Sequence, residues 1–450
     1  MVHYAHERMI TVMKFGGTSV GTPERMKEVA RIVTQEGKPV FVVLSAMSGT
    51  TNALVAIADH LYKKQPSQAN KIIDELQEKY LAHVDELLST EERRQQLRQF
   101  LQKKMDFLRE FTQGMFTSFE EKTIVAQGEV MSTYMVTAFL QEQGYDCVLL
   151  DALDFMRTDK DGEPNEPAIR QLLGDVMRQA GQHQVYITQG FICRNAFGEV
   201  DNLLRGGSDY TASLVGVALD ADEIQIWTDI DGLHNNDPRV VEHTEPVRQL
   251  NFGEAAELAY FGAKILHPTC IQPAKRAGIP VRLKFTMDPD APGTLITSEL
   301  THGAMKAVAA KDNVTAIKIR SSRMLLPTGF LRKVFEIFES YQTPVDLVAT
   351  SEVGVSVTIA DDKYLDDIVA DLQKYGHVIV DRDMCIVCVV GDLNWTNVGL
   401  ETLAIDALRD VPVRMISYGG SNHNISLLIR AEDKRRALQQ LSKKLFGAGE

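Results

Sequence analysis

Cysteine is scarce in this chain, and ligand-spaced clusters of metal-binding side chains are absent. The five cysteines among 450 residues are Cys147, Cys193, Cys270, Cys385 and Cys388. Their odd number and scattered spacing predict no disulfide framework. The pair Cys385 and Cys388 has redox spacing, but it lies in an apolar run and is expected in the core. His267 has no ligand-spaced partner, so no protein metal site is expected.

Long apolar runs and an excess of positive charge are also missing. No stretch approaches the ~18 consecutive apolar residues of a membrane-spanning helix. The formal net charge of −13 argues against nucleic acid or an anionic membrane as the main partner. Residues 1–9 are polar and lack an apolar secretory core, so we expect a cytoplasmic protein. The hydrophobic content of 44% and the length of 450 residues predict two or three globular domains.

The first predicted elements of the chain are an apolar strand, a glycine turn and a helix. The strand, residues 10–13, leads into Lys14, then Gly16 and Gly17, and a helix follows from Pro23. Backbone N–H groups at a glycine turn and the helix dipole favour an anion such as phosphate. A Walker A loop is not present. The alternative is a tight strand–helix turn with an exposed lysine.

Two further loops share this arrangement. The continuously apolar strand 39–44 runs into a small-residue loop at 45–52, as in a parallel strand buried on both faces. A third loop, residues 203–212, holds Arg205, Ser208 and Asp209 before another helix. Loops of this kind at the carboxyl ends of neighbouring strands predict a shared crevice. The sequence therefore predicts an α/β fold whose parallel-rich sheet is covered by helices.

Cations near these loops indicate the chemistry. Lys14, Arg205 and Lys264 suit phosphoryl transfer, which depends on positioning and on stabilising charge. Asp209 and Asp229 are acids that could orient the lysines or hold Mg²⁺ through water. A carboxylate acceptor is already ionised at neutral pH and needs no general base. This reasoning predicts a phosphate site and leaves the acceptor open.

Seven motifs in order resemble those of aspartate kinases within the amino acid kinase superfamily. The resemblance covers essentially the whole chain and is carried by residues 14–19, 45–49, 127–129, 205–212, 227–229 with 237–239, and 261–268. It implies ATP-dependent phosphorylation of the side-chain carboxylate of L-aspartate to 4-phospho-L-aspartate, the first step toward lysine, threonine and methionine. ATP with Mg²⁺ is the implied cofactor.

The resemblance also implies roles for individual residues. Lys14 and Asp209 would be catalytic. Substrate would be bound by Ser45, Glu129, Arg205 and Ser208. Nucleotide would be bound by Lys14, Gly16, Gly17, Thr228, Asp229, His234, Arg239 and Lys264. Many relatives have tyrosine where this chain has His234, so the nucleotide contact there is the one departure.

The C-terminal region resembles paired ACT domains, which bind amino acids as effectors. A turn-rich linker at 288–293 marks the boundary, and two βαββαβ-like units follow. We expect a catalytic region at 1–295 and a regulatory region at 296–450. The first ACT domain, about 313–383, would be inserted into a second formed by about 300–312 and 384–450. A chain of this length is expected to lack a fused homoserine dehydrogenase.

The resemblance to lysine-sensitive members implies L-lysine as the effector, with threonine as the alternative. The implied effector residues are Met324, Gly329, Phe330, Leu331, Val345, Asp346, Ser351, Glu352 and Val353. Asp346 and Glu352 are acids that could attract a cationic effector. Phe330, Leu331 and Val345 could instead be ordinary ACT core. Pairing of ACT domains between chains implies a homodimer or a dimer of dimers.

Two other functions remain open at this point. One is a superfamily kinase acting on another carboxylate such as acetylglutamate, against which the aspartate-type motifs argue. The other is an amino-acid sensor with an inactive kinase half. An inactive half predicts the loss of a charged site residue, yet Lys14, Asp209 and Lys264 are all present.

Overall fold

The computed structural model describes residues 10–203, 206–262, 266–299, 303–321 and 328–447. The chain divides into two compact units, residues 1–233 with 265–298 and residues 234–264 with 299–450. Residues 234–264 precede the boundary expected near residue 295, and their contacts place them in the second unit.

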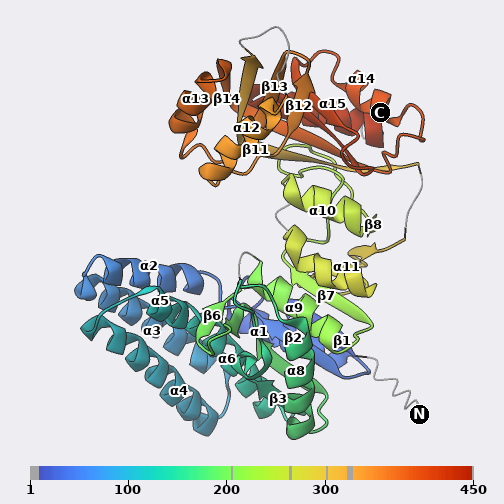
Figure 1. Ribbon diagram of the computed structural model, residues 1–450. Helices are drawn as coiled ribbons and strands as arrows, with labels where there is room; N and C mark the ends of the chain where they lie inside the picture. Colours follow the sequence, from blue (N-terminus) through green and yellow to red (C-terminus); the bar gives the residue numbers. More distant parts are fainter. Residues whose placement is uncertain (1–9, 204–205, 263–265, 300–302, 322–327, 448–450) are drawn as a thin grey trace, which may run out of the picture. The chain divides into compact units, whose positions relative to one another are not determined.

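The first unit contains a parallel sheet in the order β3-β4-β2-β1-β7-β9, extended by β10, which runs antiparallel to β9 (Figure 1). Its strands are β1 (Thr11–Phe15), β2 (Val40–Leu44), β3 (Cys147–Leu150), β4 (Val185–Gln189), β7 (Glu223–Thr228), β9 (Val281–Phe285) and β10 (Thr294–Thr297). Every residue of β2 is buried, as its continuously apolar sequence predicts. The short hairpin β5 (Ile192–Arg194) and β6 (Val200–Asn202) follows β4.

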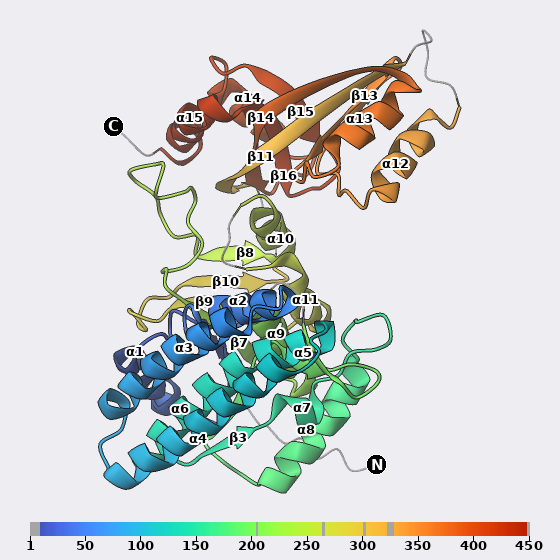
Figure 2. The ribbon, with the colours of Figure 1, turned by 90° about the vertical axis from the view of Figure 1, so that its left-hand side faces the viewer.

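Helices cover both faces of this sheet. One face packs on α1 (Pro23–Gln35) and α6 (Gln127–Glu142), and the other on α8 (Glu166–Ala180) and α9 (Gly207–Ala218). Outside α1 and α6 lie α3 (Pro66–Leu87) and α4 (Glu91–Glu110), which pack side by side (Figure 2). The remaining helices are α2 (Thr50–Tyr62), α5 (Ser118–Val125), α7 (Ala152–Phe155) and α11 (Gln272–Ala277), with 3₁₀ turns η1 (Phe111–Gln113) and η2 (Pro268–Ile271).

The second unit is built on one antiparallel sheet in the order β12-β13-β11-β14-β16-β15. Its strands are β11 (Met305–Ser321), β12 (Val348–Ser351), β13 (Gly354–Ile359), β14 (Gly376–Gly391), β15 (Val413–Tyr418) and β16 (Asn424–Arg430). The long strands β11 and β14 pair along most of their length. Two cores lie along them, as expected for two α+β ACT domains sharing a sheet.

Each core has its own pair of helices. One is covered by α12 (Phe330–Ser340) and α13 (Leu365–Gln373), the other by α14 (Leu400–Ala407) and α15 (Lys434–Phe446), which follows the 3₁₀ turn η3 (Ala431–Asp433). This unit also holds the short strand β8 (Gln249–Asn251) and α10 (Phe252–Tyr260). Helix α10 packs against β11 and β14.

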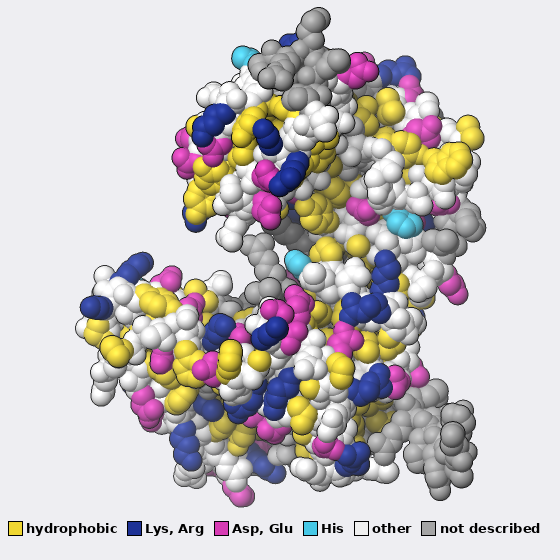
Figure 3. All heavy atoms as spheres, in the orientation of Figure 1, with side chains coloured by type: hydrophobic (Ala, Val, Ile, Leu, Met, Phe, Trp, Pro, Cys, Tyr) yellow, Lys and Arg dark blue, Asp and Glu magenta, His cyan; other side chains and the backbone are white. Residues whose placement is uncertain are grey.

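Charged side chains of both signs are mixed at the surface (Figure 3), although the net charge is −13. On the face drawn in Figure 3, Lys and Arg side chains are interspersed with Asp and Glu over each unit. Within the described part of the chain, no helix has the length and apolarity needed to cross a membrane. All five cysteines are buried, and the core position expected for Cys385 and Cys388 is confirmed.

Candidate active site

An ion pair between Lys14 and Asp209 lies at the carboxyl edge of the parallel sheet. Lys14 is near the end of β1, and Asp209 is in the first turn of α9. The Lys14 Nζ atom is 2.7 Å from Asp209 Oδ1, and the side chains are only 13% and 11% exposed. Partial burial strengthens this pair relative to a surface pair. Asp209 therefore fixes the position of the lysine charge.

The glycine turn after Lys14 packs tightly against the loop that follows β2. A Cβ atom on Gly17 would lie 2.8 Å from the carbonyl oxygen of Ala46, so only glycine fits without displacing backbone. The N–H of Ser48 donates to Gly17 O at 3.1 Å, and the N–H of Ser45 donates to Phe15 O at 3.1 Å. These contacts hold the first two predicted loops side by side.

Glu129 is a buried carboxylate beside the same loop. It lies in the first turn of α6 and is 4% exposed, and its Oε1 accepts a hydrogen bond from the Ala46 N–H at 3.2 Å. No hydrogen-bond partner for its Oε2 is found in the described part of the chain. Burial raises the pKa of Glu129 to about 7, and the Ala46 N–H opposes that rise. An unpartnered buried carboxylate oxygen is suited to an ammonium group.

The substrate residues expected on either side are also placed at this edge. Ser45 follows β2, and its carbonyl oxygen accepts a hydrogen bond from the Ser132 hydroxyl at 2.8 Å. Ser208, in the first turn of α9, is 8% exposed and packs against Gly190, where a Cβ atom would meet its Oγ at 2.5 Å. Gly190 donates its N–H to Leu44 O at 2.9 Å, which links this loop to the end of β2.

A hydroxyl clamp that the motif reasoning missed joins the glycine turn to β7 and β9. The hydroxyls of Ser19 and Thr286, both 2% exposed, are 2.8 Å apart. Thr286 also donates its hydroxyl to Thr228 O at 3.1 Å. Ser19 and Thr286 are 267 residues apart, so local spacing gives no sign of the contact. The available signal is weak: Thr286 lies three residues after the apolar run 279–283, and it directly follows the observed strand β9.

Replacing Thr286 by valine is expected to lower kcat by about 10- to 100-fold, because small displacements of positioned groups are costly. Valine keeps the volume of threonine but removes both hydroxyl contacts, so the turn and the end of β7 lose their fixed spacing. Steady-state rates with Thr286→Ser as the matched control test this, since serine keeps the hydroxyl. Equal rates for the valine variant and the parent would show that the clamp has no role in positioning.

The expected nucleotide residues fall into three groups. Thr228 ends β7, and its hydroxyl donates to Asp229 Oδ1 at 3.2 Å. In the second unit, His234 Nδ1 and the Thr244 hydroxyl are 2.7 Å apart, and Arg239 pairs with Asp237 through two hydrogen bonds of 2.9 and 2.8 Å. Arg205 and Lys264, together with the effector residue Met324, lie outside the described residues.

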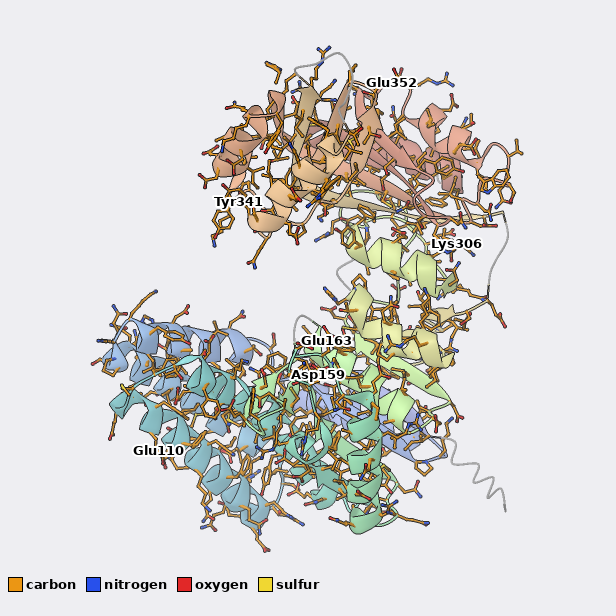
Figure 4. All side chains as sticks on the ribbon, in the orientation of Figure 1. Glu110, Asp159, Glu163, Lys306, Tyr341 and Glu352 are labelled. Atoms are coloured by element: carbon orange, nitrogen blue, oxygen red, sulfur yellow. The ribbon has the colours of Figure 1, made fainter. Side chains whose placement is uncertain are left out.

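The expected effector residues occupy two parts of the second unit. Gly329 is the N-cap of α12, followed by buried Phe330 and 40% exposed Leu331. Phe330 and Val345 pack against the core, which agrees with the alternative that they are ordinary ACT core residues. Leu331 lies at the surface, so that alternative does not apply to it. The others are Asp346, preceding β12, and Ser351, Glu352 and Val353 at the hairpin to β13. Glu352 lies at its exposed tip (Figure 4).

The residues at the carboxyl edge have the chemistry needed to bind a nucleoside triphosphate. A glycine turn, a lysine held by an acid and hydroxyl-rich strand ends are the groups that bind phosphate. Among the described residues, no three His, Cys, Asp or Glu side chains form a metal-binding group. Mg²⁺ in phosphoryl transfer is held by phosphates with one or two carboxylates, and Asp229 is a carboxylate at this edge.

Comparison with known proteins decides the family. Residues 9–284 match the model of the amino acid kinase family, and residues 387–445 match an ACT domain. The chain is 37% identical to aspartokinase 1 of Arabidopsis thaliana, covering 99% of this chain and 82% of the relative. The chain belongs to the aspartokinase family. It is also 35% identical to lysine-sensitive aspartokinase 3 of Escherichia coli, covering 97% and 99% of the two chains.

Solved aspartokinase structures agree in fold. The complex of Escherichia coli aspartokinase III with aspartate and ADP, an R-state, has a TM-score of 0.83 at 33% identity and covers 97% of this chain and all of that one. The T-state complex of the same aspartokinase with lysine and aspartate has a TM-score of 0.81 at 34% identity. The expected α/β kinase fold followed by ACT domains is therefore confirmed.

Proposed function

We propose that this aspartokinase transfers the γ-phosphoryl group of ATP to the side-chain carboxylate of L-aspartate, giving 4-phospho-L-aspartate and ADP. The observation that carries the proposal is the Lys14–Asp209 pair beneath the glycine turn, beside a carboxylate with a free oxygen, Glu129. An inactive sensor is disfavoured because this pair is intact. The aspartate complex of the Escherichia coli relative favours aspartate over acetylglutamate.

Each residue then has a physical role. The substrate carboxylate is already ionised, attacks the γ-phosphorus, and the bond from that phosphorus to the bridging oxygen breaks. The Lys14 charge stabilises the transferring group, and Asp209 orients Lys14. Glu129 Oε2 accepts the α-ammonium, Arg205 binds the α-carboxylate through its planar fork, and Ser45 and Ser208 line the substrate pocket.

Nucleotide binding uses the glycine turn and the strand end of β7. Gly16 and Gly17 bring backbone to the phosphates, and Thr228, Asp229, His234, Arg239 and Lys264 hold the rest of the nucleotide. Mg²⁺ accompanies ATP and offsets phosphate charge. In this role Arg239 exchanges part of its pairing with Asp237 for phosphate contacts.

We further propose that L-lysine inhibits the enzyme through the ACT domains of a homodimer or a dimer of dimers. The lysine complex of the Escherichia coli relative supports the effector. Asp346 and Glu352 are separated by six residues of extended chain, which is ~20 Å. Two acids so far apart cannot both contact one amino acid, so their joint use requires a second copy of the chain.

The effector assignment predicts a specific pattern of inhibition. ADP release from MgATP and L-aspartate is expected to fall at least tenfold at saturating L-lysine, within the usual range of allosteric coupling. L-threonine in a parallel titration is the control and is expected to leave the rate within twofold. Inhibition by threonine alone would retain the kinase and overturn lysine as its effector.

A further inference from the structure

Asp346 carries a buried carboxylate that is shared by two other side chains of the second unit. Its side chain is only 3% exposed. Lys311, on β11, places its Nζ 2.7 Å from Asp346 Oδ1. Tyr260, the last residue of α10, donates its hydroxyl to the same oxygen at 2.7 Å. One oxygen of the carboxylate therefore serves both internal donors.

The second oxygen of Asp346 has no hydrogen-bond partner among the residues that the structure describes. Oδ2 is buried and unpartnered, although an ionised carboxylate has about four acceptor sites. Buried polar atoms in proteins are normally hydrogen-bonded, so an unpaired carboxylate oxygen indicates an acceptor meant for a donor from elsewhere. An ammonium group is the donor that best matches a carboxylate oxygen in a buried setting.

Lys311 is held in place from two sides. Besides its contact with Asp346, its Nζ lies 4.7 Å from the centre of the Tyr260 ring, within the range of a cation–π interaction. Its side chain is 23% exposed. Burial and the Asp346 charge raise the pKa of the Tyr260 hydroxyl, so it stays a donor at neutral pH. The ammonium group of Lys311 is thus held at a fixed position beside the Asp346 carboxylate.

We propose that Lys311 sets the concentration at which the effector acts, because it shares the Asp346 carboxylate with the effector's ammonium group. This inference rests on the proposed inhibition by lysine. An ammonium arriving at Oδ2 meets the fixed charge of Lys311 on the same carboxylate, and the repulsion weakens its binding. Lys311 therefore raises the threshold for inhibition.

The contact with Tyr260 connects this carboxylate to the end of α10. Tyr260 ends α10, and Lys264 follows four residues later in the sequence. Any adjustment of Asp346 toward an effector changes the hydrogen bond at the end of that helix. The same carboxylate thus links an effector's ammonium, the internal cation and the end of α10.

The direct test is Lys311→Met in the full-length protein. Lysine binding by calorimetry and the lysine concentration for half-inhibition, each relative to the variant's own uninhibited rate, are the readouts. Removing the fixed charge is expected to lower the dissociation constant for lysine and the half-inhibition concentration by about tenfold each. Lys311→Arg keeps the charge and is expected to stay within about threefold of the parent.

The chain provides a matched control at a second triad of the same residue types. Lys374 Nζ is 2.6 Å from Asp371 Oδ1, and the Tyr341 hydroxyl donates to Asp371 Oδ2 at 2.9 Å. Tyr341 is labelled in Figure 4. No effector role is assigned to Asp371, so Lys374→Met is expected to leave lysine binding within twofold of the parent.

The outcomes separate the inference from its premise. A lysine-sensitive parent whose Lys311→Met variant binds lysine equally or more weakly overturns the role of Lys311 and leaves the proposed function intact. A parent that neither binds nor responds to lysine removes the effector assignment and this inference with it. If Lys311→Met does not fold, Tyr260→Phe removes one competing donor and is expected to lower the same two values by about threefold. In that case Lys311→Gln, which also removes the charge, is the deciding variant, and a half-inhibition concentration equal to that of the parent overturns the inference.

Discussion

Replacing Lys14 by methionine is expected to lower kcat by about 10³-fold, because a fixed charge aimed at the transferring group is lost. Methionine keeps the apolar stem of the side chain but removes the ammonium group, whose Nζ lies 2.7 Å from Asp209 Oδ1 in the parent. The effect should fall on kcat rather than on binding, since the charge acts most strongly in the transition state. Steady-state ADP release measures it.

The matched control for this variant is Lys38→Met. Lys38 forms a similar pair with Asp222, 3.0 Å between Nζ and Oδ2, but it precedes β2 and Asp222 precedes β7, at the opposite edge of the same sheet. Its loss should leave kcat within twofold. Lysine binding to the ACT domains should persist in both variants. Full turnover by Lys14→Met would show that the role given to Lys14 is wrong.

The affinity for aspartate is expected to depend on pH through Glu129. Its pKa is raised to about 7 by burial, so the carboxyl is largely protonated at pH 6 and ionised at pH 8. Only the ionised form attracts the α-ammonium of aspartate. The value of kcat/KM for aspartate, which reports the free enzyme, should therefore fall about tenfold per pH unit below pH 7 and level off above it.

Glu129→Gln should abolish this dependence and raise KM for aspartate by about 30-fold at pH 8, because a charged hydrogen bond is lost. Glu254→Gln is the matched control, since Glu254 is also buried and has a pKa raised by burial, but lies in the second unit. A pH profile that survives in Glu129→Gln would contradict the role of Glu129.

The same pKa shift predicts the sign of the stability change. An acid whose pKa rises from 4.5 to about 7 on folding stabilises the folded state most below pH 4.5 and loses that contribution as pH rises through 7. At pH 8 the ionised carboxylate costs about 3 kcal/mol. Thermal unfolding of Glu129→Gln should therefore show no loss of stability at pH 8, which separates reduced binding from unfolding.

The local sequence pattern predicts much of the fold correctly. It is wrong where the length of a strand is set by pairing with a distant strand. The buried strand 39–44 and the helix from Pro23 follow from apolar spacing, and both are confirmed. The sequence predicts two short strands, residues 306–309 and 314–319. The structure has one strand, β11, in which pairing with β14 carries the chain through an irregularity at Asn313, whose φ is 57°.

The candidate site shows the same division. The loops containing Lys14, Ser45 and Asp209 could be identified from sequence, and the structure joins them at one edge of the sheet. Sequence spacing could not pair Lys14 with Asp209, because 195 residues separate them and only the sheet topology brings them together. The pKa of Glu129 was equally out of reach, since it arises from burial by distant segments. The sequence does offer one sign of tight packing next to Glu129, since a glycine inside a helical pattern, Gly128, indicates a close approach, and a Cβ atom there would lie 2.7 Å from Ala46 Cβ.

The most direct test of the central claim is the identity of the phosphorylated product. An acyl phosphate formed on the aspartate side chain reacts with hydroxylamine to give a hydroxamate, while ADP is released in equal amount. L-aspartate with MgATP is expected to give hydroxamate, whereas L-asparagine, which lacks the side-chain carboxylate, and N-acetyl-L-glutamate are expected to give none. Hydroxamate from acetylglutamate alone, or ADP release without hydroxamate, would contradict the account.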